Sequence, residues 1–303
     1  MKVRFSIVQR RRWFFLLSGL ITVAGFIVFL LSGFNLGTDF RSGSRVQMQL
    51  NQPVDVGRVE QMLRAGGFSV PQGAITAAGT RGDAVVIRFP TVLSQAQQDT
   101  LQRLEKQYFP RSQGADVRTV DPIVAKILSR KAVWAVALAS LFIVVYIAIR
   151  FEYRFAVAAI VALLHDAFIV MSFFALFRLE VDTLFVTAVL TIVGYSVNDT
   201  IVIFDRIREN LKAEKPKTFE ELEALVDRSL WQTMSRSINT VLTVLIAAVM
   251  LFLFGGASIH TFTLALIIGL VSGAYSSIFI ASPLWVVWRG RALPRAATAA
   301  KTP

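Results

Sequence analysis

Asp199 lies inside an apolar stretch, with residues 186–193 before it and residues 201–204 after it. In the hydrocarbon of a bilayer, a carboxylate costs about 2.5–3.5 kcal/mol on insertion scales unless it is paired, hydrated or protonated. A helical period gives this acid polar neighbours on its own helix. These neighbours are Thr191, Tyr195, Ser196 and Asn198. An acid of this kind inside a membrane segment is typical of a proton or ion site.

The same acid has a second, purely structural interpretation. Hydrogen bonds between polar side chains are common contacts between membrane helices. Asp199 could therefore hold two helices together without any part in transport. The sequence leaves both interpretations open.

Two further places interrupt the apolar pattern. His165 and Asp166 lie near the centre of another apolar run, and Arg236 opens a third one. Acids at the middle of a bilayer are rare, so Asp166 is a strong candidate for the same site, whereas His165 could equally be a hydrogen-bonded core residue. The polar residues that continue the face of Arg236 at helical spacing are Asn239, Thr240 and Thr243.

Asp199 and Arg236 lie at a similar depth in the bilayer if their two segments are antiparallel neighbours. An aspartate that alternates between an ion pair with Arg236 and an unpaired state would release and take up a proton. The sequence therefore suggests a proton relay formed by Asp199, Arg236, Asp166 and His165. The alternative for Arg236 is a cation that extends from the helix end to the membrane surface.

The composition is that of a membrane protein. Of the 303 residues, 54% are hydrophobic and only 17% are charged, which excludes a soluble enzyme. The net charge of +12 does not indicate a nucleic-acid partner, because the basic residues cluster beside the apolar runs. The absence of cysteine excludes disulfides and cysteine-ligated metals, and two histidines make a His-rich metal site improbable. We expect no cofactor.

Several runs reach the roughly 20 apolar residues that cross a hydrocarbon core. The pattern predicts six transmembrane helices, at residues 13–34, 131–150, 155–177, 183–204, 237–254 and 261–288. Residues 205–236 are predicted to form a cytoplasmic loop with an amphipathic helix over 219–230. Every basic cluster falls on one side if residues 1–12 and the tail 289–303 are cytoplasmic, as the positive-inside rule favours.

Residues 35–130 form the one long polar region. Alternating patterns predict strands at 45–50, 70–78, 84–89 and 116–120, and helices at 55–65 and 94–108. That order is β-α-β-β-α-β, the split pattern of a ferredoxin-like fold. The sequence therefore predicts a small exported α+β domain between the first and second transmembrane helices.

One long motif resembles a known family. Residues 194–210 (GYSVNDTIVIFDRIREN) are similar to the fourth-span signature of SecF, an accessory subunit of the bacterial protein translocase. Weaker similarities follow the same order along the chain, at residues 36–40, 162–166, 232–240 and 254–256. Residues 41–45 depart from the family, which usually has a Thr-Gly-Gly run at this point.

The resemblance implies more than the residues themselves indicate. SecF pairs with SecD, and the pair associates with the SecYEG channel and the SecA motor in the bacterial cytoplasmic membrane. The complex uses the proton gradient to help preproteins leave the channel. In that family the acid matching Asp199 and the arginine matching Arg236 belong to the proton path. The fold is similar to half of the resistance-nodulation-division exporters, so a six-span chain needs a partner half.

Two other functions are weighed against this one. A proton-driven exporter of small molecules or lipids would share the fold class, but usually has twelve spans and two large outer domains. A structural scaffold subunit would use the buried charges only to hold helices together.

Overall fold

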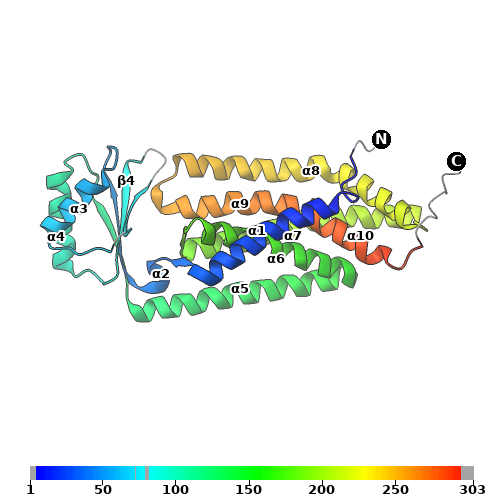
Figure 1. The fold of residues 1–303 in the computed structure, drawn as a ribbon, viewed down its shortest axis with the longest axis horizontal. Helices are drawn as coiled ribbons and strands as arrows, with labels where there is room; N and C mark the ends of the chain where they lie inside the picture. The colour runs from blue at the N-terminus through cyan, green and yellow to red at the C-terminus, as the bar shows by residue number, and fades with distance from the viewer. Residues whose placement is uncertain (1–4, 72, 79–81, 295–303) are drawn as a thin grey trace.

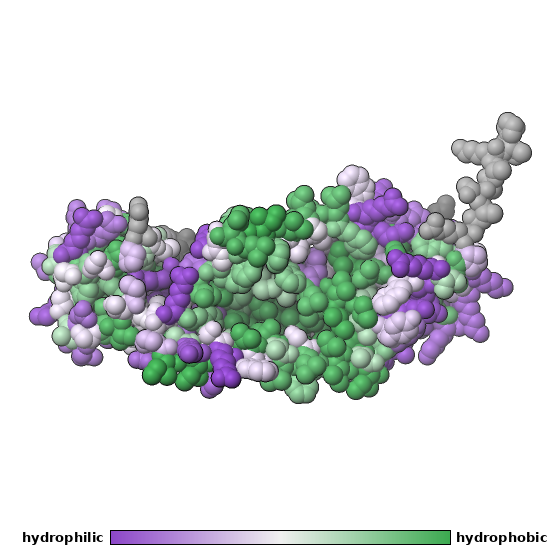
Figure 2. Space-filling view, turned by 60° about the horizontal axis from the view of Figure 1, so that its bottom comes forward, coloured by the Kyte–Doolittle hydropathy of each residue, from purple (hydrophilic) through white to green (hydrophobic). Residues whose placement is uncertain are grey.

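The structure is a computed structural model that describes residues 5–71, 73–78 and 82–294. A helical bundle occupies most of its length, and a small α/β domain lies at one end (Figure 1). A broad hydrophobic band covers the middle of the molecule between more hydrophilic ends (Figure 2). The start of α1 and the end of α10 both lie at the end far from the α/β domain (Figure 1).

Within the described residues, six helical segments are long and apolar enough to cross a membrane, which confirms the predicted class of protein. The first five are α1 (Arg11–Ser32), α5 (Pro122–Arg150), α6 (Tyr153–Leu176), α7 (Thr183–Glu214) and α8 (Phe219–Phe254). The sixth is assembled from η1 (Ala257–Ile259), α9 (His260–Ser276), the π-helical η2 (Ser277–Ala281) and α10 (Ser282–Gly290). The α6, α7 and α9 helices are the most buried, whereas α1, α5 and α8 expose most of their apolar surface.

The α/β domain has the predicted order of elements. These elements are β2 (Gly43–Gln49), α3 (Val56–Ala65), β3 (Ile75–Ala78), β4 (Ala84–Phe89), α4 (Gln95–Tyr108) and β5 (Ala115–Val120). All neighbouring strands are antiparallel, in the order β3-β4-β2-β5, which is the ferredoxin-like topology. Helix α3 is capped by the Asp55 side chain, and α4 begins with a capping box between Ser94 and Gln97.

The sheet of this domain is tied to the bundle by charged residues. Arg45 on β2 and Arg88 on β4 are opposite each other in register. Both meet Glu180, with Arg88 Nη2 at 2.5 Å from Glu180 Oε2, and Arg45 also lies 3.8 Å from Asp182 Oδ2. Glu180 belongs to β6 (Glu180–Val181), which pairs in parallel with β1 (Asn35–Leu36). This two-stranded contact could not be predicted from the sequence, because its strands are only two residues long.

Several predicted boundaries are corrected by the structure. The predicted loop 205–236 is almost entirely helical, since α7 runs to Glu214 and α8 begins at Phe219. A capping box between Thr218 and Glu221 starts α8, whose first turns bury their apolar face against the bundle. Residues 122–130, assigned to the exported domain, belong to α5, because Asp121 caps that helix and Pro122 occupies its first turn.

The first turns of α8 also hold the start of the chain. The Asp227 carboxylate accepts hydrogen bonds from Ile7 N at 2.9 Å, Val8 N at 3.0 Å and the Ser6 hydroxyl. Arg11 forms an ion pair with Glu223 one turn earlier. The helix predicted over 219–230 is present as the first turns of α8, and together with the N-terminal segment it caps the bundle.

Candidate functional site

Helices α6, α7 and α9 meet closely in the centre of the bundle because small residues line their contacts. A Cβ atom on Gly269 would lie 2.2 Å from the Ile192 side chain, and one on Gly273 would lie 3.3 Å from Ser196 Cβ. Small residues at this spacing allow membrane helices to approach through their backbones. The close approach brings polar side chains of three helices into one seam, which we call the polar seam (Asp166, Ser196, Asp199, Thr200, Ser272, Ser276 and Ser277).

Asp166 on α6 is the most enclosed acid of the seam and is 1% exposed. Its Oδ2 accepts hydrogen bonds from Ser196 Oγ at 2.5 Å and Ser276 Oγ at 2.6 Å, and its Oδ1 accepts one from Ser272 Oγ at 2.7 Å. His165 Nδ1 lies 3.1 Å from the same Oδ1. The carboxyl group thus accepts hydrogen bonds from serines of two other helices, α7 and α9, which offsets the cost of its burial.

Asp199 on α7 is also buried, at 8% exposed, but has different surroundings. Its Oδ2 is inaccessible and has no hydrogen-bond partner within the described part of the chain. Arg236, Ser237 and Ser277 are the groups that interact with it electrostatically. The structure records no ion pair between Asp199 and Arg236, although both residues are described. A buried carboxyl oxygen without a donor is free to carry a proton without losing a bond.

A π-helical segment connects the surroundings of the two acids. Within η2, the Ser277 hydroxyl lies 2.8 Å from Thr200 Oγ1 and donates to the Ser196 carbonyl at 3.4 Å. Ser282 Oγ donates to the carbonyl of Ser277, five residues earlier, at 3.0 Å. Ser196 also donates to Asp166. A continuous series of polar groups therefore leads from Asp166 to Thr200, the residue next to Asp199. Single turns of π-helix are frequent at functional sites.

The remaining predicted site residues lie on the outer side of this seam. Tyr195 is half-buried, whereas Asn198, Arg236, Asn239, Thr240 and Thr243 are exposed. The Thr240 hydroxyl donates to the carbonyl of Arg236 at 2.9 Å, and Thr243 donates to that of Thr240 at 2.9 Å. The hydroxyl groups of these two threonines are therefore hydrogen-bonded within their own helix. Asn198, Arg236 and Asn239 are the polar groups that face outward.

Sequence reasoning missed the serines of the last segment, Ser272, Ser276 and Ser277. The available signal was Gly269 and Gly273, a pair of glycines four residues apart within an apolar run, which is typical of close helix packing. The described residues contain no group of three or more acidic or histidine side chains placed to hold a metal ion.

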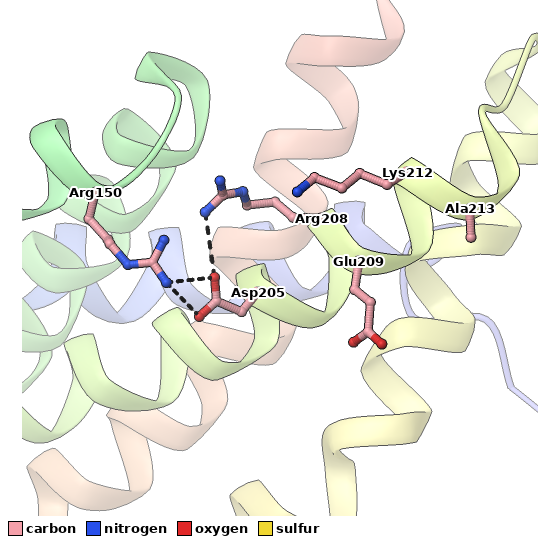
Figure 3. Close-up of a pocket in the computed structure, with 6 residues that line it drawn as sticks. All are labelled: Arg150, Asp205, Arg208, Glu209, Lys212 and Ala213. Atoms are coloured by element: carbon pink, nitrogen blue, oxygen red, sulfur yellow. Dashed lines mark hydrogen bonds and ion pairs between the residues drawn. The ribbon is translucent and has the colours of Figure 1, made fainter.

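A second charged cluster lies at the end of the bundle far from the α/β domain (Figure 3). Asp205 on α7 lies between Arg150, at 3.4 Å, and Arg208, at 3.5 Å. Both guanidinium groups also lie over the ring of Phe151. These side chains are partly exposed, and within the described residues no hydrogen bond joins them to the polar seam, so the cluster is a surface feature.

Comparison with known families agrees with this architecture. Residues 100–291 match the family described as "Protein export membrane protein SecD/SecF, C-terminal", and residues 27–54 match the SecD/SecF GG motif. Gly43 lies in the second match. It has a φ of +115°, and a Cβ atom there would lie 2.2 Å from the Phe89 carbonyl oxygen, so this turn requires glycine.

Several known proteins are similar to nearly the whole chain. "Protein translocase subunit SecF" of Alicyclobacillus acidocaldarius is 61% identical over 98% of this chain and 96% of its own length. "Protein translocase subunit SecDF" of Bacillus subtilis is 45% identical over 96% of this chain, which spans only 39% of that protein. The crystal structure of SecDF from Thermus superposes with a TM-score of 0.83 at 33% identity, over 96% of this chain and 40% of that one. The chain therefore belongs to the SecD/SecF family of protein export membrane proteins, among its SecF members.

Proposed function

We propose that this chain is a SecF subunit of the Sec translocase accessory complex, which couples the proton-motive force to a late stage of preprotein export. The family membership supports the role in export. The observation that supports proton coupling is Asp199, a buried acid whose Oδ2 has no hydrogen-bond donor beside a seam of hydroxyl groups. The role is that of a transport subunit and not of an enzyme.

In the proposed cycle, Asp199 takes up a proton from the outer side and releases it toward the cytoplasm. Arg236 approaches the carboxylate once the proton has left. The serines and Asp166 bind the proton through hydrogen bonds along the polar seam, and His165 contacts Asp166. One charge that crosses the membrane potential releases about 2.3 kcal/mol per 100 mV. That energy is comparable with the few kcal/mol that separate two conformations of a protein.

A partner half is required by the exposed polar face of α7 and α8. Asn198, Arg236 and Asn239 are exposed on two helices that are long and apolar enough to cross a membrane. Lipid disfavours such groups, so another protein surface should cover them. The SecDF relatives carry a further region about one and a half times as long as this chain, which supports a SecD chain as the partner. The SecYEG channel, SecA and the translocating preprotein complete the proposed assembly.

The proposed location is the bacterial cytoplasmic membrane. We place the start of α1 and the end of α10 in the cytoplasm and the ferredoxin-like domain outside, because most basic clusters then lie on the inner side. No nucleic-acid partner is proposed. The nearest alternatives are half of an exporter of small molecules or lipids and a scaffold subunit.

Replacement of one acid separates these functions. In inside-out membrane vesicles, Asp199→Asn should abolish the part of preprotein export that depends on the proton gradient while SecD still co-purifies. Asp205→Asn is the matched control, because it makes the same chemical change six residues along α7 at an exposed position. A scaffold subunit would lose SecD from the complex when Asp199 is replaced. Normal gradient-dependent export by Asp199→Asn would contradict the proposed motor.

A further inference from the structure

A hollow of about 510 Å³ lies between α2 (Thr38–Arg41) and the first turns of α5, at the end of the bundle next to the ferredoxin-like domain. Three cations line it, Arg41 from α2 and Lys126 and Arg130 from α5, and no acidic side chain does. All three are exposed, and none has an ion-pair partner in the described part of the chain. A concentration of unpaired positive charge in one hollow indicates an anionic ligand.

The position of these cations is unusual for a membrane helix. In the proposed orientation they lie on the outer side, where the positive-inside rule disfavours lysine and arginine. At the opposite end of α5, Arg150 is balanced by Asp205. The three cations therefore need an explanation other than orientation of the chain.

The cations continue into an apolar stripe on the same face of α5. Residues three, four or seven apart share one side of a helix, and the side of Arg130 carries Lys126, Trp134, Leu141 and Val145. Trp134, Leu141 and Val145 are 57%, 56% and 45% exposed. At 1.5 Å per residue, Arg130 and Leu141 are about 17 Å apart along the helix, close to the ~15 Å of hydrocarbon in one leaflet. The order along the stripe is charge, tryptophan and hydrocarbon, which is the order of the layers of a bilayer.

The cation from α2 is held in place by its backbone. Asp39, two residues before Arg41, accepts hydrogen bonds from Thr183 N at 3.0 Å and Thr183 Oγ1 at 2.5 Å. After Arg41 the chain turns through Ser42 and Gly43, both at positive φ, against the Phe89 carbonyl. The backbone of α2 is thus fixed between the bundle and the sheet, so Arg41 faces α5 across a preformed hollow.

We propose that this hollow binds the phosphate headgroup of an anionic phospholipid, whose acyl chain lies along Trp134, Leu141 and Val145. Arg41, Lys126 and Arg130 would contact the phosphate, and the hydroxyls of Ser42 and Ser129, which also line the hollow, would donate to its oxygens. A free phosphate ion or an acidic peptide would match the charge but would leave the apolar stripe unused. The proposal requires only that the chain spans a membrane, and it does not depend on proton coupling.

The test uses the full chain in a neutral detergent and native mass spectrometry. Phosphatidylglycerol should remain bound in preference to phosphatidylethanolamine. Lys126→Gln together with Arg130→Gln should weaken the retention of phosphatidylglycerol by about 25-fold, since each cation near a membrane surface contributes about fivefold. Arg64→Gln together with Arg103→Gln, exposed on the ferredoxin-like domain, removes the same charge and should have no effect. The conservative change Arg130→Lys should preserve binding and shows that loss of fold is not the cause.

A phosphatidylglycerol with a photoreactive acyl chain should label the peptide that contains Leu141 and Val145. Equal retention of phosphatidylglycerol by the wild-type chain and the Lys126/Arg130 variant would overturn the proposal, as would labelling confined to other helices. Displacement of the lipid by an equal concentration of inorganic phosphate would show a site for the free ion and would overturn it as well.

Discussion

The two buried acids of the polar seam should respond differently to the same chemical change. In Asp166→Asn, one carboxylate oxygen becomes an amide NH₂ group, which cannot accept a hydrogen bond. If that atom is Oδ2, the hydroxyls of Ser196 and Ser276, at 2.5 and 2.6 Å, lose their acceptor. The alternative orientation removes the bond from Ser272 and the contact with His165 Nδ1. Either way, two of the groups that now face a carboxylate oxygen face an amide NH₂ group instead.

The magnitude follows from those two contacts. A hydrogen bond to a charged group contributes roughly 1.5–3 kcal/mol, so Asp166→Asn should destabilise the chain by roughly 3–6 kcal/mol. Asp199→Asn breaks no bond at Oδ2, because that oxygen has no partner, and should change stability by less than about 1 kcal/mol. Ser276→Ala removes a single donor and should lie between the two.

The assay is thermal unfolding of the full chain in detergent, followed by intrinsic fluorescence at pH 7. At about 2 °C per kcal/mol for a chain of this size, Asp166→Asn should melt at least ~6 °C below wild type. Asp199→Asn should melt within about 2 °C of it. The reasoning would be refuted if the order were reversed, with Asp199→Asn strongly destabilised and Asp166→Asn unchanged.

Three other predictions concern packing and titration. Gly269→Val should destabilise the bundle by about 1–3 kcal/mol in the same melting assay, because the new Cβ atom would lie 2.2 Å from the Ile192 side chain. Gly194→Ala should be neutral, because no atom lies near the position of its Cβ atom. Burial raises the pKa of Asp182 from 3.8 to about 6. The folded state therefore binds this proton more tightly than the unfolded state does. The free energy of unfolding should fall by on the order of 3 kcal/mol as the pH rises from about 4 to 6. Asp182→Asn should remove that slope from a pH series of melting curves, and a slope that persists would exclude this residue as its source. Burial also raises the pKa of Glu105, so Glu105→Gln should stabilise the ferredoxin-like domain at pH 7 by about 1 kcal/mol or more. Slower hydrogen exchange of α4 in the full chain would verify this, and faster exchange would count against it.

The membrane spans and the exported domain could be predicted because each depends on local patterns. Hydropathy over about 20 residues locates the six helical segments, and alternation with turn residues gives the β-α-β-β-α-β order that the structure has. The boundaries were less accurate. Residues 205–236 were predicted to be a loop with a helix over 219–230, because charge was taken as the end of a span, whereas α7 continues to Glu214 and α8 runs without a break from Phe219 to Phe254.

The arrangement of the candidate site could be predicted only in part. Asp166 and Asp199 stand out because lipid disfavours carboxylates. Their different surroundings depend on α9, whose serines come from 106 and 110 residues away in sequence. No single-helix period can indicate which of the serines in an apolar run faces an acid on another helix. The same limit explains why the β1–β6 pair and the contacts of Asp227 with the N-terminal segment were missed.

The central claim is that the Asp199 carboxyl gains and loses a proton during the working cycle. Infrared difference spectroscopy on the chain reconstituted with its SecD partner, with isotope-labelled aspartate, would follow this directly. We predict a protonated-carboxyl band that changes when a pH gradient is imposed, that is absent in Asp199→Asn and that persists in Asp205→Asn. A spectrum in which no Asp199 signal changes with the gradient would contradict the proposed coupling.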